Sequence, residues 1–177
     1  MIRHIFLALT AFVLAAPALV TAQEDPIVVY LVRHAERADD VLGADMATTD
    51  DPLLSTAGRE RSYLLARMLA DAELTRIHST DLKRTRWTGQ PTSEMMGLAI
   101  ELYDPSDLTG FARQLGTTSG RHLVVGHSNT LPQLIEALGG NPGDPIERLE
   151  YDRLYILSII EGEVGTVLIR FGNRYHG

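Results

Sequence analysis

The chain has 177 residues, of which 45% are hydrophobic and 22% are charged, and this is ordinary for one globular domain. Its net charge of -7 excludes a general basic surface for nucleic acid or anionic lipid, so any affinity for phosphate must be local. The sequence contains no cysteine, which excludes disulfides and a lipid-modified cysteine anchor.

The first 22 residues have the features of a secretory signal peptide. A positive start is followed by an apolar run over residues 5–20, which ends in small residues suited to cleavage after Ala22. An uncleaved anchor is the alternative, but the run is short for a membrane span and contains Pro17. We therefore expect residues 23–177 to form one exported domain without stable membrane association. A chain without cysteine is typical of the bacterial periplasm, with full secretion as the alternative.

The first predicted strand leads into a group of charged residues. An apolar run over residues 27–32 predicts a buried strand, and Arg33, His34 and Arg37 follow it. Two arginines suit a phosphate, because each guanidinium matches phosphate oxygens in a bidentate fork. Their charges also disfavour the protonated imidazole, and a neutral imidazole that faces a phosphate is a competent nucleophile. An ordinary surface loop is the alternative for these residues, so the interpretation as a phosphate site depends on the rest of the chain.

A polar loop over residues 38–52 comes next and is long for a connector. Its acids lack the regular spacing and closing glutamate of a calcium loop, so we expect them to be solvated. They are Asp39, Asp40, Asp45, Asp50 and Asp51. Ser55 then caps a predicted helix that ends near Ala72. Its apolar residues recur at helical spacing and are expected to face the core, namely Leu64, Leu65, Met68 and Leu69. The expected solvent face carries Arg59, Glu60, Arg61 and Arg67.

A short strand over residues 75–79 leads into a second helix, for which Asp81 is the predicted N-cap. This helix begins with Lys83, Arg84 and Arg86, although basic residues early in a helix oppose its dipole. A bound anion would remove the conflict, and a local rule broken without structural gain indicates function. Arg84 is the candidate, because the other two are expected to face water.

The next predicted elements are a strand over 98–103 that stops at Asp104 and a helix over 108–115. A strand over 121–126 stops at His127 and is followed by a helix through Leu138. The last predicted element is a hairpin of strands over 154–160 and 164–171. Strands that alternate with helices predict a mostly parallel sheet with helices on both faces. We therefore expect a single-domain α/β fold, a three-layer α/β/α sandwich with an antiparallel hairpin at the edge of the sheet.

In such sheets, ligands bind at the carboxyl ends of the parallel strands. Five candidate residues follow predicted strands at this edge, namely Arg33, His34, Arg84, Asp104 and His127. They describe an oxyanion site in which one histidine attacks phosphorus, the arginines and the second histidine hold the oxygens, and an acid protonates the leaving group. A metal site on the two histidines is the alternative, but arginines beside the ligands would repel a dication.

Four segments, in this order, resemble the histidine phosphatase superfamily, whose members have a phosphoglycerate mutase-like fold. They are 31–36 (LVRHAE), which resembles the family's Arg-His-Gly signature, 51–58 (DPLLSTAG) at the opening of a helix, 79–88 around the second arginine, and 124–128 (VVGHS) with the second histidine. The resemblance implies that His34 carries the phosphoryl group as a phosphohistidine. It also implies that Arg33, Arg84 and His127 bind this group, and that no metal or cofactor takes part.

The chain departs from the family pattern at three positions. Ala35 stands where glycine is common, and Asp40 stands where mutase-like members often carry an asparagine near the phosphate. An anion at that position would be unhelpful unless it is turned away. Ser128 follows the second histidine, so the His-Asp donor pair of the acid phosphatase and phytase branch is missing.

The proton donor is therefore expected after the third strand, as in the mutase branch. Asp104 is the candidate, with Glu101 and Glu36 as alternatives. Too few residues separate Arg84 from His127 for the cap insertions of larger members, so we expect an open site, as in small SixA-like phosphatases. Such a site suits phosphohistidine on a protein or bulky phosphoesters.

The expected function is that of a metal-independent phosphatase that acts through a phosphohistidine intermediate. Its substrate would be a phosphomonoester or phosphohistidine, on a small molecule or a phosphoprotein. A mutase is disfavoured, because the chain is short and lacks further basic residues to hold a second acidic group. A non-catalytic domain that binds phosphorylated ligands in the same pocket is the alternative.

Overall fold

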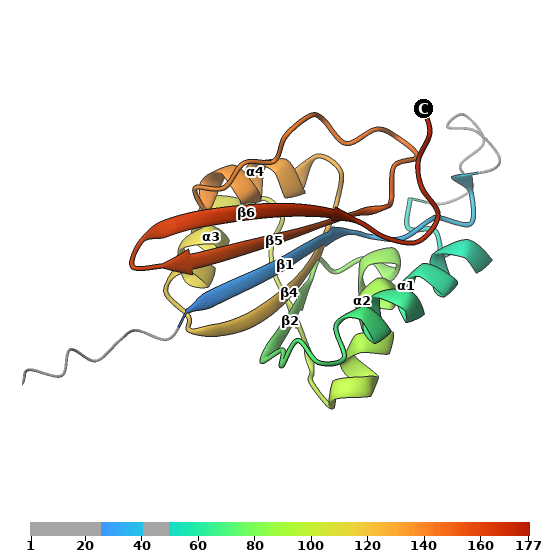
Figure 1. Ribbon diagram of the computed structural model, residues 1–177. Coiled ribbons are helices and arrows are strands. Elements are labelled where there is room, and N and C mark those ends of the chain that lie inside the picture. Colours follow the sequence, from blue (N-terminus) through green and yellow to red (C-terminus); the bar gives the residue numbers. More distant parts are fainter. Residues whose placement is uncertain (1–25, 41–49) are drawn as a thin grey trace, which may run out of the picture.

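The computed structural model describes residues 26–40 and 50–177, which form a central sheet between two pairs of helices (Figure 1). The predicted signal peptide and residues 41–49 of the acidic loop lie outside the described residues. Within the part of the chain that the structure describes, no helix is long and apolar enough to cross a bilayer. The predicted three-layer α/β fold, with its antiparallel hairpin at one edge, is confirmed.

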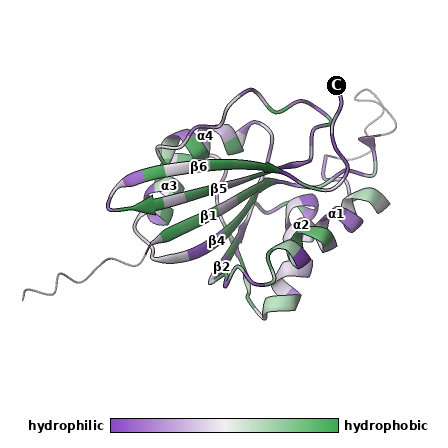
Figure 2. Cartoon of the chain, viewed as in Figure 1, coloured by the Kyte–Doolittle hydropathy of each residue, from purple (hydrophilic) through white to green (hydrophobic). Residues whose placement is uncertain are grey.

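Six strands form the sheet in the order β3-β2-β4-β1-β5-β6. Their bounds are β1 (Ile27–Arg33), β2 (Arg76–Ser79), β3 (Ile100–Leu102), β4 (Gly120–Gly126), β5 (Arg153–Ile160) and β6 (Glu163–Arg170). The first four run parallel, and β5 and β6 continue the sheet in antiparallel pairing. The central strand β1 is apolar along most of its length (Figure 2), as expected for a strand that is covered on both faces.

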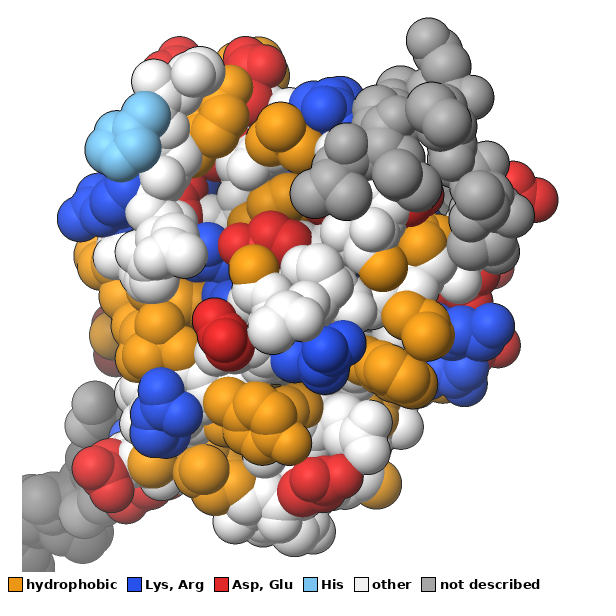
Figure 3. Space-filling view, turned by 90° about the vertical axis from the view of Figure 1, so that its right-hand side faces the viewer, with side chains coloured by type: hydrophobic (Ala, Val, Ile, Leu, Met, Phe, Trp, Pro, Cys, Tyr) orange, Lys and Arg blue, Asp and Glu red, His pale blue; other side chains and the backbone are white. Residues whose placement is uncertain are grey.

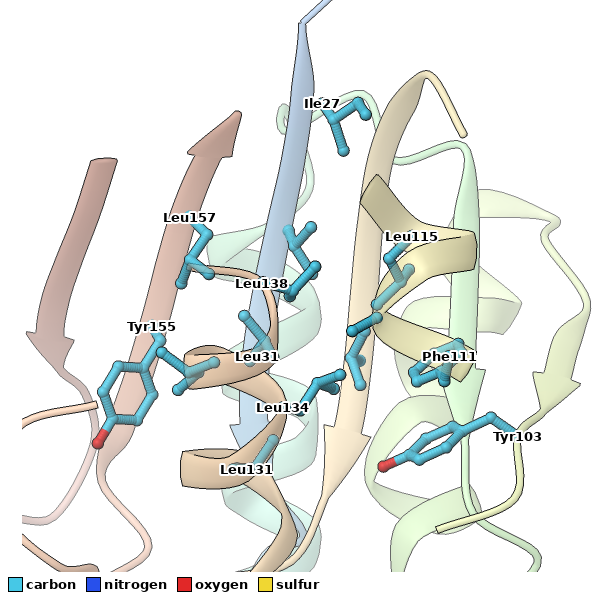
Figure 4. Close-up of a cluster of buried hydrophobic side chains, with 14 residues drawn as sticks. Ile27, Leu31, Tyr103, Phe111, Leu115, Leu131, Leu134, Leu138, Tyr155 and Leu157 are labelled. Atoms are coloured by element: carbon cyan, nitrogen blue, oxygen red, sulfur yellow. The ribbon is translucent and has the colours of Figure 1, made fainter. Parts of the chain in front are cut away.

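Helices cover both faces of the sheet. They are α1 (Thr56–Met68), α2 (Lys83–Met96), α3 (Leu108–Gly116) and α4 (Thr130–Ala137). On one face, Leu31 of β1 and Leu157 of β5 belong to the same buried cluster as Leu134 of α4 (Figure 4). On the other face, Leu65 of α1 and Ile77 of β2 belong to a second cluster. The sheet is thus fixed between two apolar cores.

The register of the strands brings their ends together at one edge of the sheet. Arg33 of β1 pairs with Gly126 of β4, and Ser79 of β2 pairs with Val125. Because β5 runs in the opposite direction, its first residue, Arg153, reaches the same edge. The segments that follow β1, β2 and β4 therefore meet there with the segment that precedes β5.

Arg61 was predicted to face solvent, and this prediction is wrong. Its side chain is buried, with 7% exposed, and its guanidinium donates to the Glu36 carboxylate at 2.8–3.0 Å. It also donates to the backbone carbonyls of Phe171 and Asn173. Close packing supports this junction, because a Cβ added to Gly58 would lie 2.3 Å from the Glu36 carbonyl oxygen. These contacts fix the segment after β1 against α1 and the C-terminal segment.

Candidate active site

A cavity of about 510 Å³ opens at this edge of the sheet. Figure 3 views the molecule from the side toward which β1 runs in Figure 1, and basic and acidic side chains are interspersed over this face. Five of the six predicted site residues line the cavity, namely Arg33, His34, Arg37, Arg84 and His127. The other lining residues are Leu82, Pro105, Ser106, Ser128, Asn129 and Thr130. The sixth predicted residue, Asp104, does not line it.

His34 has the geometry of a nucleophile. It is 3% exposed, and its backbone N–H donates to the Gly126 carbonyl at 2.9 Å. Its Nδ1 lies 2.9 Å from the Ala35 carbonyl oxygen, which can only accept, so the neutral ring carries its proton on Nδ1 and its lone pair on Nε2. Burial, and then the charges of Arg33 and Arg84, hold its pKa well below the usual 6.5. The imidazole is therefore neutral at neutral pH.

Arg33 keeps one donor group unused. Its Nη1 donates to the backbone carbonyls of Glu147 and Glu150 at 2.9 and 3.1 Å. Its guanidinium carbon lies 4.1 Å from the centroid of the Tyr151 ring. Among the described residues, its buried Nε has no hydrogen-bond partner. Since a buried N–H without an acceptor is costly, this arrangement fits an arginine that completes its hydrogen bonds with a bound anion.

Arg84 lies in the first turn of α2, where basic residues oppose the helix dipole. Asp51 relieves part of this conflict, because its carboxylate accepts from the Lys83 backbone N–H at 2.9 Å and lies 3.6 Å from the Arg84 guanidinium. The predicted N-cap, Asp81, pairs instead with Arg86 at 2.9 Å, so that prediction is wrong. Within the described residues, the buried Nε of Arg84 also has no partner. Arg84 thus retains a donor for an anion.

His127 lies across the cavity from His34, with the two ring centroids 5.5 Å apart. The Thr130 hydroxyl accepts from its backbone N–H at 3.1 Å, and the Thr80 hydroxyl lies 2.9 Å from its Nε2. Burial, and then the two arginines, lower the pKa of His127 to about 4. Thr80 was not predicted as a site residue, because a hydroxyl after a strand gives no chemical signal beyond its position.

Comparison with known proteins assigns these residues to a family. A sequence model of the histidine phosphatase superfamily (branch 1) matches residues 29–105, which include His34 and Arg84 at the cavity. Residues 29–105 thus match the histidine phosphatase superfamily, as the resemblance predicted. No curated protein gives a significant match to its sequence.

Solved structures described as phosphatases share the fold of this chain over almost their whole length. A protein assigned as the phosphohistidine phosphatase SixA of Agrobacterium tumefaciens is 25% identical, with a TM-score of 0.61 over 82% of this chain and 99% of that chain. The protein histidine phosphatase SixA complexed with tungstate is 18% identical, with a TM-score of 0.63 over 81% and 97%. A protein of Escherichia coli K-12 assigned as an alpha-ribazole-5'-P phosphatase is 14% identical, with a TM-score of 0.68 over 82% and 97%. The latter two similarities concern the fold alone, and the predicted resemblance to the superfamily and its small SixA-like members is confirmed.

Two acids shortly after the segment 31–36, Asp39 and Asp40, are held by donors of their own. Asp39 accepts from the Nε and Nη2 of Arg37 at 2.8 and 2.5 Å, so the Arg37 guanidinium is already partly engaged at the cavity. Asp40 accepts from the Arg37 backbone N–H at 2.8 Å and from the Tyr151 hydroxyl at 2.7 Å. Neither acid lines the cavity.

The three predicted proton donors are not brought to the cavity. Asp104 is exposed and accepts from the backbone N–H and hydroxyl of Ser106 at 2.8 and 2.7 Å, and these bonds lower the pKa of its carboxyl. Glu101 and Glu36 each pair with an arginine. The physical reason is the set of partners that each carboxylate already has, because Pro105 and Ser106 do line the cavity while the Asp104 side chain is turned to Ser106.

The Asp104→Asn variant should hydrolyse both alkyl phosphates and p-nitrophenyl phosphate at rates close to the wild type. Removal of a general acid would instead cost about 10²–10⁴-fold on alkyl phosphates and little on p-nitrophenyl phosphate, whose leaving group needs no protonation. Steady-state rates on both substrates provide the measurement. Asp107→Asn, on the same exposed segment, is the control. A selective loss on alkyl phosphates in the Asp104 variant alone would restore Asp104 as the donor.

The lowered pKa of His34 sets the expected pH dependence. Only the neutral imidazole attacks phosphorus, so kcat/KM should fall as the pH drops through this pKa, with a midpoint below pH 6.5. Arg84→Met removes one charge that lowers the pKa, so its midpoint should lie above that of the wild type. Because both proteins are measured on one substrate, the ionisation of the substrate cancels. A midpoint that stays or moves down in the variant would contradict this account.

Proposed function

We propose that the protein is a phosphatase that transfers the phosphoryl group of its substrate to Nε2 of His34 and then hydrolyses this phosphohistidine. One observation supports the proposal most strongly. A buried, neutral histidine shares a cavity with Arg33 and Arg84, and each arginine has a buried Nε–H without a partner among the described residues. A phosphoryl group would satisfy these donors and present phosphorus to the histidine.

The proposed reaction has two steps. The lone pair of His34 Nε2 attacks phosphorus in line, the bond from phosphorus to the leaving group breaks, and the leaving group takes a proton from solvent water. Arg33 and Arg84 stabilise the charge on the equatorial oxygens during this transfer. Water then attacks the phosphohistidine, the P–N bond breaks, and inorganic phosphate leaves a neutral His34 for the next turnover.

The surroundings of the cavity favour substrates whose leaving group needs little protonation. Among the described residues, those that line it include no carboxylic acid. Imidazole, whose conjugate acid has a pKa of about 6.5, leaves far more readily than an alkoxide. Phosphohistidine on a protein is therefore the substrate class that we propose first, and the SixA structures that share this fold are described as protein histidine phosphatases. Phosphomonoesters with acidic leaving groups are a second class.

A second candidate function is a domain that binds phosphorylated ligands without turnover. The observation in its favour is again the cavity lining, which offers no general acid within the part of the chain that the structure describes. The phosphate-binding arginines would serve such a domain equally well. The presence of a neutral, buried histidine between them favours the phosphatase, because binding alone does not need a nucleophile.

Turnover by the purified protein in EDTA tests the proposal and separates the two candidates. We expect hydrolysis of p-nitrophenyl phosphate and of free N-phosphohistidine, with much slower hydrolysis of alkyl phosphates. Activity should persist in EDTA, because arginines occupy the places where a metal site needs acids. Binding of vanadate without turnover would establish the binding domain. Loss of activity in EDTA with recovery on addition of zinc or manganese would contradict the mechanism.

A further inference from the structure

Tyr151, which lies two residues before β5, contacts three parts of the candidate site at once. Its side chain is buried, with 4% exposed. Its ring supports the Arg33 guanidinium, with 4.1 Å from the guanidinium carbon to the ring centroid, and its centroid lies 5.8 Å from that of His34. Its hydroxyl donates to Asp40 Oδ2 at 2.7 Å. No motif in the sequence marks this residue.

The contact with Asp40 resolves a departure from the family pattern. A carboxylate at this position would repel a bound phosphate if it faced the cavity. The two donors that hold its Oδ2 are the Tyr151 hydroxyl and the Arg37 backbone N–H, and Asp40 does not line the cavity. A hydrogen bond to a carboxylate is among the stronger ones in proteins, so the hydroxyl is a substantial part of what fixes this acid.

The contact with Arg33 acts on the phosphate-binding side. The Nη1 of Arg33 is anchored by two backbone carbonyls, and the guanidinium carbon lies over the Tyr151 ring. A guanidinium stacks on an aromatic face because the ring carries partial negative charge there. Together these contacts fix the plane of the guanidinium, so that the unpartnered Nε–H keeps one direction.

We infer that Tyr151 is a positioning residue with two separable roles. Its ring holds Arg33 in place for the phosphoryl group, and its hydroxyl keeps the Asp40 carboxylate turned away from that group. This inference rests on the proposed phosphate-binding function of the cavity.

A double-mutant cycle tests the role of the hydroxyl. Tyr151→Phe keeps the ring and removes the hydroxyl, so Asp40 loses one of its two hydrogen bonds and turns more easily toward the cavity. Arg33 loses only a long hydrogen bond from its Nη2 to the same hydroxyl, at 3.5 Å, and this loss is common to both backgrounds of the cycle. We expect the vanadate dissociation constant and the KM for p-nitrophenyl phosphate to rise about tenfold, the equivalent of one hydrogen bond to a carboxylate, with a much smaller change in kcat. In an Asp40→Asn background, the same change should raise them by less than about threefold, because the charge is gone.

Tyr151→Leu tests the role of the ring. It removes the stacking surface under Arg33 as well as the hydroxyl, so Asp40→Asn should not restore vanadate affinity in this variant. Tyr155→Phe is the matched control, because Tyr155 is also buried and its hydroxyl donates to the Pro142 carbonyl outside the cavity. It should lower the thermal midpoint without changing the KM.

Two results would overturn the inference. One is unchanged vanadate affinity in Tyr151→Phe, and the other is an equal loss in the wild-type and Asp40→Asn backgrounds, which a purely structural role would give. Vanadate binding separates these outcomes from failure of the proposed function. If the wild type binds vanadate but does not turn over substrate, the phosphatase proposal fails while the cycle still decides the role of Tyr151. If the wild type does not bind vanadate, both fail.

Discussion

Replacing His34 with alanine should remove nearly all turnover, by roughly 10⁴–10⁶-fold, the scale seen when a catalytic nucleophile is deleted. The Ala35 carbonyl holds the Nδ1 proton of His34, and burial keeps the ring neutral, so Nε2 is the atom that attacks. The variant should still bind vanadate weakly, because Arg33 and Arg84 remain at the cavity. Rates on p-nitrophenyl phosphate and calorimetric titration with vanadate provide the two measurements.

The covalent intermediate gives an independent check on this assignment. Wild-type protein quenched during turnover should carry an acid-labile, base-stable phosphoryl group on His34, and peptide mass spectrometry at high pH locates it. His127→Ala should form the same adduct more slowly, because His127 holds the phosphoryl group without bonding to it. His176→Ala is the control, since His176 is exposed and does not line the cavity. An adduct on His127 or on a serine, or normal rates in His34→Ala, would contradict the assignment.

The fold could be predicted from the sequence because it follows from local patterns. The apolar runs that precede Arg33 and His127 mark buried strands, and parallel strands bring their carboxyl ends to one edge of a sheet. His34 and His127 lie close together because the strands that they follow, β1 and β4, are neighbours in the sheet. Arg84 reaches the same cavity from the start of α2, after β2 pairs with β4.

Asp104 shows where the same reasoning stops. The pattern places it at the correct edge, and its neighbours Pro105 and Ser106 do line the cavity. The Asp104 carboxylate itself accepts from the backbone N–H and hydroxyl of Ser106 and does not line the cavity. An edge of a sheet is thus predictable from local patterns, while the direction of one side chain depends on turn contacts that these patterns do not describe.

Arg61 and Asp51 could not be placed for a different reason. Helix periodicity and capping preferences describe neighbours within about four residues, whereas both side chains act over long sequence distances. Arg61 pairs with Glu36, and Asp51 caps α2 at Lys83. A charged residue that pairs with a partner far away in the sequence can be buried, even where its local pattern predicts exposure to solvent. Tyr151 belongs to the same class, because its partners come from the other half of the chain.

Arg33→Ala should lower kcat/KM by about 10²–10³-fold, the loss expected when one preorganised donor to a developing oxyanion is removed. Three features of Arg33 suit this role. Its Nη1 is fixed by two backbone carbonyls, and its guanidinium carbon lies over the Tyr151 ring. Its buried Nε–H has no partner among the described residues. Vanadate affinity should fall as well, because the same donors contact the anion in its bound state. The pKa of His34 should rise, since the charge of Arg33 is one of the causes that lower it.

Arg33→Lys separates charge from geometry. An ammonium keeps the positive charge but cannot form a bidentate fork or stack flat on Tyr151, so we expect it to recover only a small part of the lost kcat/KM. Thermal melts are needed beside the kinetics, because either change leaves the carbonyls of Glu147 and Glu150 without their donor, at about 1–3 kcal/mol for each unsatisfied group. Arg113→Ala, an exposed change on α3, is the control. Full recovery of kcat/KM in Arg33→Lys would mean that a simple positive charge is sufficient. Wild-type vanadate affinity in Arg33→Ala would exclude Arg33 from the phosphate site.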